Sequence, residues 1–222
     1  MARPDFSQTV VVLDLDDTLY KEADYHISGM REVCTWVEAL YGKPVAESLE
    51  VCRKQGERDL LGAISRLANL PAVVKESLLW IYRLHVPAIS ISDAVRDLIK
   101  QLEATCRAVA ILTDGRSVSQ RQKLKALGLA HLPVYISEEY GSEKPDGLRF
   151  RQIMQDFPAH RYVYVGDNPE KDFVAPNALN WTTIGLRGDE RNIHSQECDG
   201  LPVEKFPQQW IDSLDELLGS IC

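Results

Sequence analysis

The chain has 222 residues, of which 45% are hydrophobic and 26% charged, so it is long enough for one globular domain that carries an insertion. Its formal net charge of -8 disfavours a nucleic-acid-binding protein, because such proteins need a basic face. An anionic ligand would need local compensation from a metal ion, a lysine or backbone N–H groups.

No segment indicates secretion or membrane insertion. Residues 1–10 show no basic-then-apolar signal pattern, and no apolar run reaches the roughly 18 residues of a membrane span. We therefore expect a cytoplasmic protein without a membrane partner. The cysteines form no C-x-x-C pair and the histidines have no metal-binding spacing, which predicts buried free thiols and no structural zinc site. The cysteines are Cys34, Cys52, Cys106, Cys198 and Cys222.

The first predicted element is a strand over residues 9–15, with the sequence TVVVLDL. It is nearly continuous in apolar character, as expected of a strand covered on both faces. The strand ends in three carboxylates, Asp14, Asp16 and Asp17.

Residues 21–91 contain no convincing strand and are predicted to form a helical module. Pro44 and Pro71 separate helical stretches, and the segment 86–92 resembles a linker that returns to the sheet. The expected helices cover residues 25–41, 45–54, 57–69 and 72–86.

From residue 92 onward, strands alternate with helices. Such alternation predicts an α/β fold with a doubly wound parallel sheet, built from residues 1–20 and 92–222, with the all-helical module of residues 21–91 inserted into it. The expected strands cover residues 108–113, 133–137, 162–166 and 181–185, and the expected helices cover residues 92–106, 120–129, 147–157 and 208–218.

Polar residues follow each of the first four strands. After the first come the three acids, after the second Thr113, after the third Lys144, and after the fourth Asp167 and Asp172. Ligands of open α/β sheets bind beyond the carboxyl ends of the strands, so these side chains are expected to converge on one edge of the sheet.

Acids, a hydroxyl and a lysine in one place favour phosphoryl transfer. A carboxylate can accept the phosphoryl group as an aspartyl-phosphate and so divide a very slow hydrolysis into two steps. A Mg²⁺ ion held by oxygen ligands would screen the repulsion between the carboxylate and the phosphate. A lysine, a threonine hydroxyl and N–H groups at a helix N-terminus would hold the remaining phosphate oxygens.

Four sequence motifs resemble those of the haloacid dehalogenase superfamily, in its phosphatase branch. They are D-x-D-x-T from Asp14 to Thr18, then Thr113, then Lys144-Pro145, then G-D-x-x-x-x-D over residues 166–172, in the family's order. The resemblance implies that Asp14 is the nucleophile and Asp16 the general acid and base. It also implies that the helical module is a cap over the site.

The same resemblance implies the metal and phosphate ligands. Mg²⁺ would be bound by Asp14, the backbone carbonyl of Asp16 and Asp167, with Asp172 as an indirect partner. The transferring phosphoryl group would be held by Thr113, Asp114, Gly115 and Lys144.

One residue departs from the family's pattern. Asp114 stands where relatives often have asparagine, and it adds negative charge beside a phosphate. It is expected to cap the helix that begins near Gly115, with Arg116 as the cation that offsets its charge. Asp17 is expected to be solvated or to form a turn.

These observations favour a Mg²⁺-dependent phosphatase that acts on a small phosphate monoester, such as a sugar phosphate, phosphoglycolate or a nucleotide. A 2-haloacid dehalogenase would share the scaffold but needs no acid at Asp16. A phosphomutase would keep the same motifs. A phospho-accepting signalling domain would be shorter and would lack the insertion, and a catalytically silent binding protein has no need of the complete motif set. The sequence leaves the metabolite and the oligomeric state open.

Overall fold

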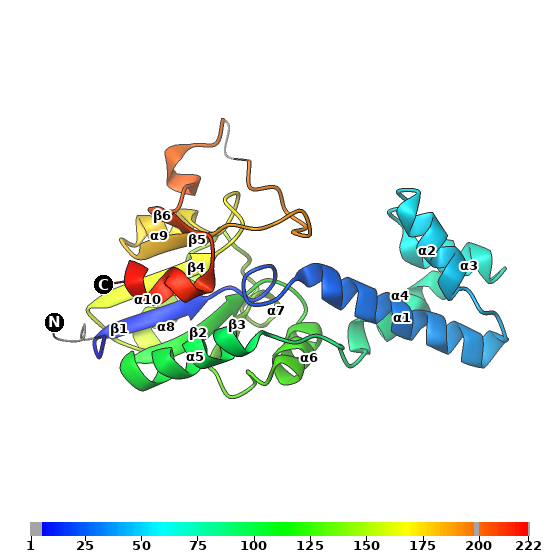
Figure 1. The fold of residues 1–222 in the computed structure, drawn as a ribbon, viewed down its shortest axis with the longest axis horizontal. Helices are drawn as coiled ribbons and strands as arrows, with labels where there is room; N and C mark the ends of the chain where they lie inside the picture. Colours follow the sequence, from blue (N-terminus) through cyan, green and yellow to red (C-terminus); the bar gives the residue numbers. More distant parts are fainter. Residues whose placement is uncertain (1–5, 198–199, 222) are drawn as a thin grey trace. The chain divides into compact units, whose positions relative to one another are not determined.

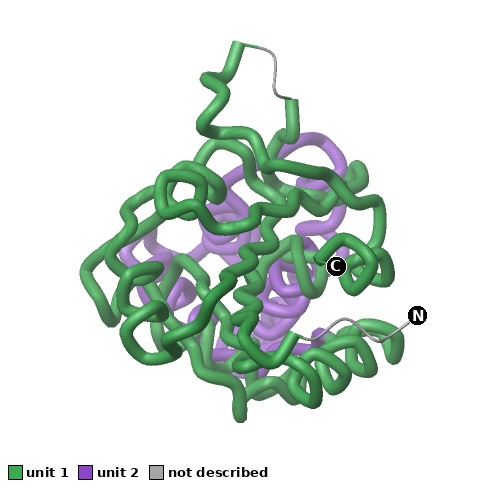
Figure 2. Tube along the Cα trace, turned by 90° about the vertical axis from the view of Figure 1, so that its left-hand side faces the viewer, with its two compact units in different colours: residues 1–22, 90–222 green, residues 23–89 purple. Residues whose placement is uncertain are grey.

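The structure is a computed structural model that describes residues 6–197 and 200–221. The chain divides into two compact units, one of residues 1–22 with 90–222 and the other of residues 23–89 (Figure 2). The sequence had placed these boundaries after residues 20 and 91.

The larger unit contains one sheet of parallel strands in the order β3-β2-β1-β4-β5-β6 (Figure 1). The strands are β1 (Thr9–Leu13), β2 (Ala108–Thr113), β3 (Val134–Ile136), β4 (Arg161–Gly166), β5 (Thr182–Leu186) and β6 (Gln209–Ile211). The α/β fold class and the parallel sheet expected from the sequence are confirmed.

Strand β1 lies in the middle of the sheet. Val10 pairs with Ala108 on one side and with Tyr162 on the other, and all five residues of β1 are buried. Its β-branched side chains suit a strand that is packed on both faces. Because its neighbours are β2 and β4, the residues that follow these three strands are brought to one edge of the sheet.

The helices of this unit cover both faces of the sheet. On one face Val10 and Val12 pack with Phe150 and Ile153, and Trp181 joins the same cluster. Helix α5 and turn η2 are in contact with each other, and α5 and α10 lie in front of the sheet in Figure 1. The helices and turns are α5 (Asp93–Thr105), α6 (Ser117–Leu127), α7 (Ser137–Tyr140), α8 (Leu148–Asp156), α9 (Val174–Ala178), η1 (Val203–Lys205), η2 (Leu214–Glu216) and α10 (Leu217–Ser220).

Two of these helices have defined end signals. The Ser92 hydroxyl caps α5 by accepting a hydrogen bond from the backbone N–H of Val95, 3.2 Å away. Gly128 ends α6 in the left-handed conformation, with φ of 76°, where glycine has no steric penalty.

The expected helix over residues 208–218 was wrong. Residues Gln209–Ile211 form β6, which pairs with β5, and they are followed by η2 and α10. Ile211, Leu214 and Leu217 are all buried, so the spacing that indicates a helical face instead marks three residues on three successive short elements.

The smaller unit is an all-helical insertion between β1 and β2. Its core contains Val33, Val37, Leu49, Ile64 and Leu78, all buried. The Asp59 carboxylate caps the third helix by accepting from the N–H of Gly62, 3.0 Å away. The helices are α1 (Glu22–Tyr41), α2 (Ala46–Lys54), α3 (Leu60–Leu67) and α4 (Val74–Leu84).

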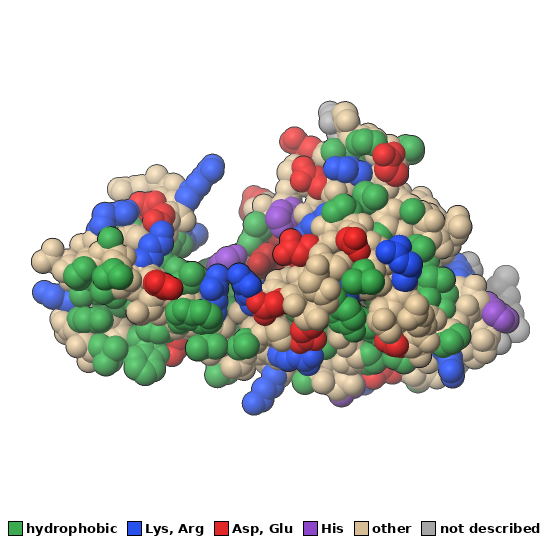
Figure 3. Space-filling model, turned by 180° about the vertical axis from the view of Figure 1, so that it is seen from behind, with side chains coloured by type: hydrophobic (Ala, Val, Ile, Leu, Met, Phe, Trp, Pro, Cys, Tyr) green, Lys and Arg blue, Asp and Glu red, His purple; other side chains and the backbone are tan. Residues whose placement is uncertain are grey.

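Hydrophobic side chains also lie on the surface of the insertion, on the left of Figure 3. The most exposed large ones on its helices include Leu40, Trp80 and Leu84. Among the described residues no helix is both long and apolar enough to cross a membrane. Cys34, Cys52 and Cys106 carry free thiols; Cys34 is buried as expected, whereas Cys52 and Cys106 are partly exposed, and Cys198 and Cys222 lie outside the described residues.

Candidate active site

The carboxyl end of β1 buries the first acid of the D-x-D-x-T motif. The Asp14 side chain is 8% exposed. Its Oδ1 accepts a hydrogen bond from the N–H of Leu15 at 2.8 Å, and its Oδ2 lies 2.9 Å from the Lys144 Nζ. The strand therefore presents Asp14 with one oxygen held by the backbone and the other by a cation.

Lys144 is enclosed by groups from β1 and β4 and the loops that follow these two strands. Its Nζ is 2.6 Å from Asp172 Oδ1 and donates to the Tyr164 hydroxyl at 3.1 Å, and its side chain is 1% exposed. Burial alone would lower the pKa of Lys144, but the charges of Asp14 and Asp172 raise it well above the usual value. The ammonium group thus stays charged beside the predicted nucleophile.

Three carboxylates gather around this lysine. Asp14, Asp167 and Asp172 each offer an oxygen, and these oxygens lie within 4.8 Å of one another. Burial and the charge of Asp172 raise the pKa of Asp167 to about 8, and burial, opposed by Lys144, raises the pKa of Asp14 to about 6. One lysine does not compensate three buried acids, so the cluster suits a divalent cation.

Asp172 is held by neighbours on both of its oxygens. Oδ1 pairs with Lys144, and Oδ2 accepts from the N–H of Asn168 at 2.8 Å. Its side chain is fully buried. These contacts show that Asp172 holds Lys144 and the turn after β4 in place.

The end of β2 delivers Thr113 and Asp114. The Thr113 side chain is buried, and its hydroxyl accepts from the Gln120 side-chain amide at 2.6 Å. The Asp114 carboxylate lies 2.5 Å from the Arg149 guanidinium and 3.4 Å from the Lys171 Nζ. Burial opposes ionisation of Asp114, but Lys144, Arg149 and Lys171 hold its pKa below the ordinary value.

The expectations for the surroundings of Asp114 were wrong. Arg116 does not offset its charge but pairs with Glu138 at 2.7 Å, and Asp114 makes no cap contact with α6. Arg149, which is fully buried on α8, takes the place foreseen for Arg116 and also donates to the carbonyl of Thr113 at 2.8 Å. The extra charge of Asp114 is thus neutralised by a residue that is distant in sequence.

Gly115 lies beside the site with its N–H already engaged. That N–H donates to the Ser137 hydroxyl at 2.9 Å, and the residue has φ of 133°, which a side chain would strain. The role of Gly115 in holding a phosphate stays a prediction.

Asp17 forms a turn, as one of its two expected roles required, but it is not solvated. It is 3% exposed and adopts the left-handed conformation with φ of 54°. Its two oxygens accept from the N–H groups of Glu22 and Ile193, at 2.9 and 2.8 Å. Asp17 therefore ties the loop after β1 to the loop after β5.

The loop after β5 also reaches the acid cluster. Asn192 donates through Nδ2 to Asp167 at 3.2 Å and accepts through Oδ1 from Lys21 at 2.5 Å. Neither Lys21 nor Asn192 belongs to a sequence motif. Their contacts join residues that are far apart in the sequence, so no local pattern indicates them.

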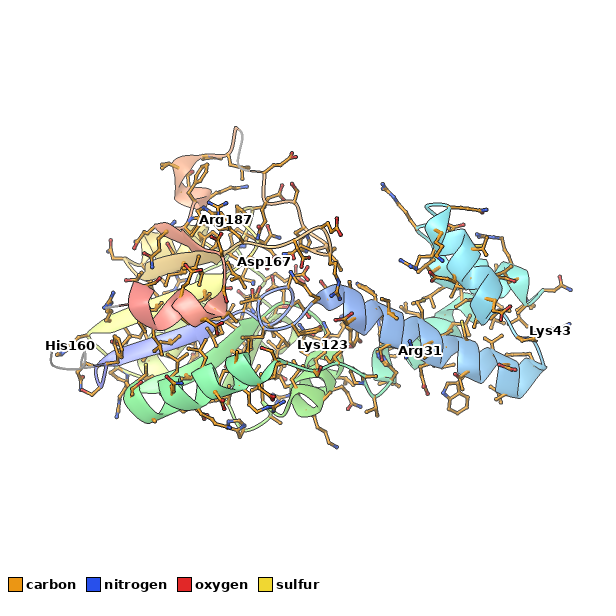
Figure 4. All side chains as sticks on the ribbon, viewed as in Figure 1. Arg31, Lys43, Lys123, His160, Asp167 and Arg187 are labelled. Carbon is orange, nitrogen blue, oxygen red and sulfur yellow. The ribbon has the colours of Figure 1, made fainter. Side chains whose placement is uncertain are left out.

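Asp16 lines the same pocket but is not one of the three clustered acids. Its carboxylate accepts hydrogen bonds from Tyr20, Gln120 and Lys123, the last two on α6. Burial would raise the pKa of Asp16, but Lys123 and these hydrogen bonds lower it. Figure 4 labels Lys123 and Asp167 near the carboxyl end of the sheet, and His160 at the opposite end.

One pocket of about 120 Å³ joins most of the predicted residues. Asp172 belongs to the acid cluster, but neither it nor Gly115 is among the lining residues of this pocket. Burial and the nearby Asp16 raise the pKa of Glu22, which the sequence did not single out, to about 7. The pocket is lined by Asp14, Asp16, Asp17, Glu22, Thr113, Asp114, Lys144, Asp167, Asn168, Lys171 and His194, all from the larger unit.

Comparison with known proteins gives one family and several relatives. Residues 11–186 match the family model of haloacid dehalogenase-like hydrolases. The glyceraldehyde 3-phosphate phosphatase of Methanocaldococcus jannaschii is 24% identical over 223 residues, which cover 93% of this chain and 97% of that protein. The ribulose-1,5-bisphosphate 5-phosphatase of Halopiger xanaduensis is 27% identical over 240 residues, covering 94% and 97%.

A solved structure shares the fold over nearly the whole chain. The HAD-hydrolase YfnB of Bacillus subtilis, solved bound to magnesium, aligns with a TM-score of 0.63 at 20% identity, covering 97% of this chain and 99% of that one.

Proposed function

This chain belongs to the haloacid dehalogenase-like hydrolases, and from that premise we propose that it is a Mg²⁺-dependent phosphatase that hydrolyses a small phosphate monoester through an aspartyl-phosphate. The observation that carries the proposal is the buried contact of 2.9 Å between Asp14 and Lys144 in a pocket that Asp16, Thr113 and Asp167 also line. The phosphatase names of relatives that align over nearly their full length support it.

In the first step, an oxygen of Asp14 attacks phosphorus and the bond from phosphorus to the ester oxygen breaks. Asp16 gives a proton to the departing alkoxide, so the products are the alcohol and an aspartyl-phosphate on Asp14. Lys144 and the Thr113 hydroxyl hold oxygens of the phosphoryl group and stabilise the charge that develops on them.

In the second step, a water molecule attacks the same phosphorus. Asp16, now ionised, takes a proton from the water, and the bond between phosphorus and Asp14 breaks. Inorganic phosphate leaves, and Asp14 returns to a carboxylate.

The acid cluster fits a magnesium ion in its donor chemistry. Mg²⁺ prefers carboxylate oxygens together with waters and phosphate, and Asp14 and Asp167 are buried acids that one lysine does not neutralise. Asp14, Asp167 and the Asp16 carbonyl would hold it. When bound, the ion would screen the approach of a carboxylate to a phosphate dianion.

We also propose that residues 23–89 act as a cap that selects the substrate. The residues that line the pocket are mostly charged, so they suit the phosphate group. Recognition of the alcohol portion of the ester is therefore left to other residues. A sugar phosphate, phosphoglycolate or a nucleotide is the expected class of ester.

A panel of phosphate esters tests the function directly. We expect one or a few small esters to be hydrolysed with Mg²⁺, EDTA to abolish release of inorganic phosphate, and added Mg²⁺ to restore it. Ca²⁺ should not restore it, because it is larger and takes more ligands. Full hydrolysis after removal of all metal would refute the mechanism, and a phosphate moved to another position of the same molecule would identify a phosphomutase.

A second prediction concerns stability and needs no substrate. Asp14 and Asp167 have folded-state pKa values of about 6 and about 8, above the unfolded value of 3.8, so the metal-free protein loses stability as pH rises from about 4 to about 8. Protons and Mg²⁺ compete for these carboxylate oxygens, so the apparent affinity for Mg²⁺ should rise roughly tenfold per pH unit between about pH 6 and pH 8.

The measurement is the shift in melting temperature that Mg²⁺ produces at several pH values. The shift should be larger at about pH 8 than at about pH 5.5, and Asp167→Asn should remove both the shift and its pH dependence. A shift of equal size at all pH values would mean that Mg²⁺ binds elsewhere.

A further inference from the structure

Two polar side chains lie on the buried face of α6. Gln120 is 2% exposed and Lys123 is 4% exposed, and the apolar residues Leu124 and Leu127 of the same helix are also buried. Residues three apart on a helix share a face, so Gln120 and Lys123 point the same way. A buried lysine is costly unless a carboxylate compensates it.

Both side chains are directed at one carboxylate. The Lys123 Nζ lies 2.7 Å from Asp16 Oδ1 and 2.9 Å from Asp16 Oδ2, and the Gln120 Nε2 lies 2.9 Å from Asp16 Oδ2. The Tyr20 hydroxyl donates to Oδ1 from the other side. Each oxygen of Asp16 is thus held by at least two donors, and two of the three donor residues come from α6.

Gln120 also connects Asp16 with the loop after β2. Its Nε2 is 2.6 Å from the Thr113 hydroxyl and 2.8 Å from the Asp114 carbonyl. One amide group has two hydrogens for these three acceptors, so it links the motif after β1 to the motif after β2 rather than serving either alone.

Neither Gln120 nor Lys123 lines the pocket, whereas Asp16, Thr113 and Asp114 do. The two α6 residues therefore stand behind the groups that face a substrate. This placement separates them from Lys144 and Lys171, which line the pocket themselves.

We propose that Lys123 and Gln120 are positioning residues that hold the Asp16 carboxyl group in the orientation from which it exchanges protons with the leaving group and with water. The inference rests on the proposed function, because it assigns a purpose to contacts of the predicted acid. A carboxylate on a loop has rotational freedom, and fixing it by two charge-assisted bonds and an amide bond keeps its oxygens in one orientation relative to the pocket.

The test compares two esters that differ in their need for a proton. Phenyl phosphate has a poor leaving group and dinitrophenyl phosphate a good one. Lys123→Met, which keeps the length of the side chain, should lower kcat/KM for phenyl phosphate on the order of 10²-fold and for dinitrophenyl phosphate less than roughly threefold. The ratio kcat/KM reports the first step, so slow hydrolysis of the aspartyl-phosphate does not mask the difference.

Three further variants complete the experiment. Gln120→Met should also lower kcat/KM more for phenyl phosphate than for dinitrophenyl phosphate, by roughly tenfold for phenyl phosphate. Lys123→Arg, which keeps the charge and the donors, should retain more phenyl phosphate activity than Lys123→Met. The matched control is Lys125→Met, an exposed lysine on the same helix, which should equal the wild type on both esters. Melting temperatures identify any variant that does not fold. If Lys123→Met does not fold, the two esters are compared with Gln120→Met instead.

The outcomes are separable. A selective loss on phenyl phosphate supports the inference. An equal loss on both esters, or no loss, in folded variants overturns it and leaves the proposed function standing. If the wild type and Lys125→Met release no phosphate from any ester with Mg²⁺, the proposed function itself fails, and the inference with it.

Discussion

Asp14→Asn is expected to abolish phosphate release, with a loss of at least about 10⁴-fold in kcat, because the variant has no carboxylate to attack phosphorus. The amide keeps the shape of the side chain and an oxygen that can accept from the Leu15 N–H. The fold should therefore persist. Loss of one negative charge from the buried cluster should also lower the pKa of Asp167.

Mass spectrometry distinguishes this loss from a general defect. With acetyl phosphate as donor, Asp16→Asn should retain the Asp14 nucleophile and accumulate an adduct of roughly 80 Da, because its aspartyl-phosphate lacks the base that activates water. Asparagine is preferred to alanine at position 16 because it leaves Lys123 an acceptor in a buried place. An adduct on Asp14→Asn, or one that maps to another residue in Asp16→Asn, would contradict the assigned roles.

Lys144→Met should have the second largest effect, and on two properties at once. Removing the charge that holds the phosphoryl oxygens should lower kcat/KM by roughly 10²-fold or more. It also leaves Asp14 and Asp172 buried without their shared cation, and breaking a buried ion pair from one side typically costs about 3 to 5 kcal/mol of stability.

The two effects respond differently to conditions. Lower pH protonates the orphaned carboxylates, so the stability loss of Lys144→Met should shrink towards about pH 4, whereas activity should not return. Lys171→Met is the matched control: its side chain is 30% exposed and pairs with Asp114 at 3.4 Å, so its stability loss should be much smaller. A Lys144→Met protein as stable as the wild type at about pH 8 would show that the buried pair does not contribute as its geometry implies.

The convergence of the site could be predicted because it depends on local signals and one topological rule. Continuous apolar runs identified β1, β2 and β4, and parallel strands bring whatever follows them to the same edge. Asp14, Thr113 and Asp167 were placed in this way, without any knowledge of which strand lies beside which.

The partners of those residues could not be predicted from local patterns. Arg149 neutralises Asp114 from α8, and Lys123 reaches Asp16 from α6, so each pair is set by the packing of a helix on the sheet. The nearest cation in sequence, Arg116, was the wrong choice for this reason. A usable signal existed for α6, because Gln120 and Lys123 fall on its apolar face together with Leu124.

The last strand was missed because short edge strands have weak signals. β6 spans only Gln209–Ile211, too few residues to show an alternating pattern. Leu214 and Leu217, which follow β6, lie at helical spacing from Ile211. This longer pattern led to the predicted helix over residues 208–218.

The central position of β1 has a consequence for the order in which a newly made chain can fold. Val10 pairs with Ala108 and Tyr162, so at about 5 to 20 residues per second roughly 5 to 20 s pass between synthesis of β1 and of its first partner. The helical insertion has its own core and emerges within that interval. It can therefore fold on the ribosome while β1, the apolar strand before it, is still unpaired. Unpaired strand edges promote chaperone binding and aggregation. Nascent chains in which the insertion has emerged but β2 has not should accordingly carry a folded insertion and an unpaired, apolar β1.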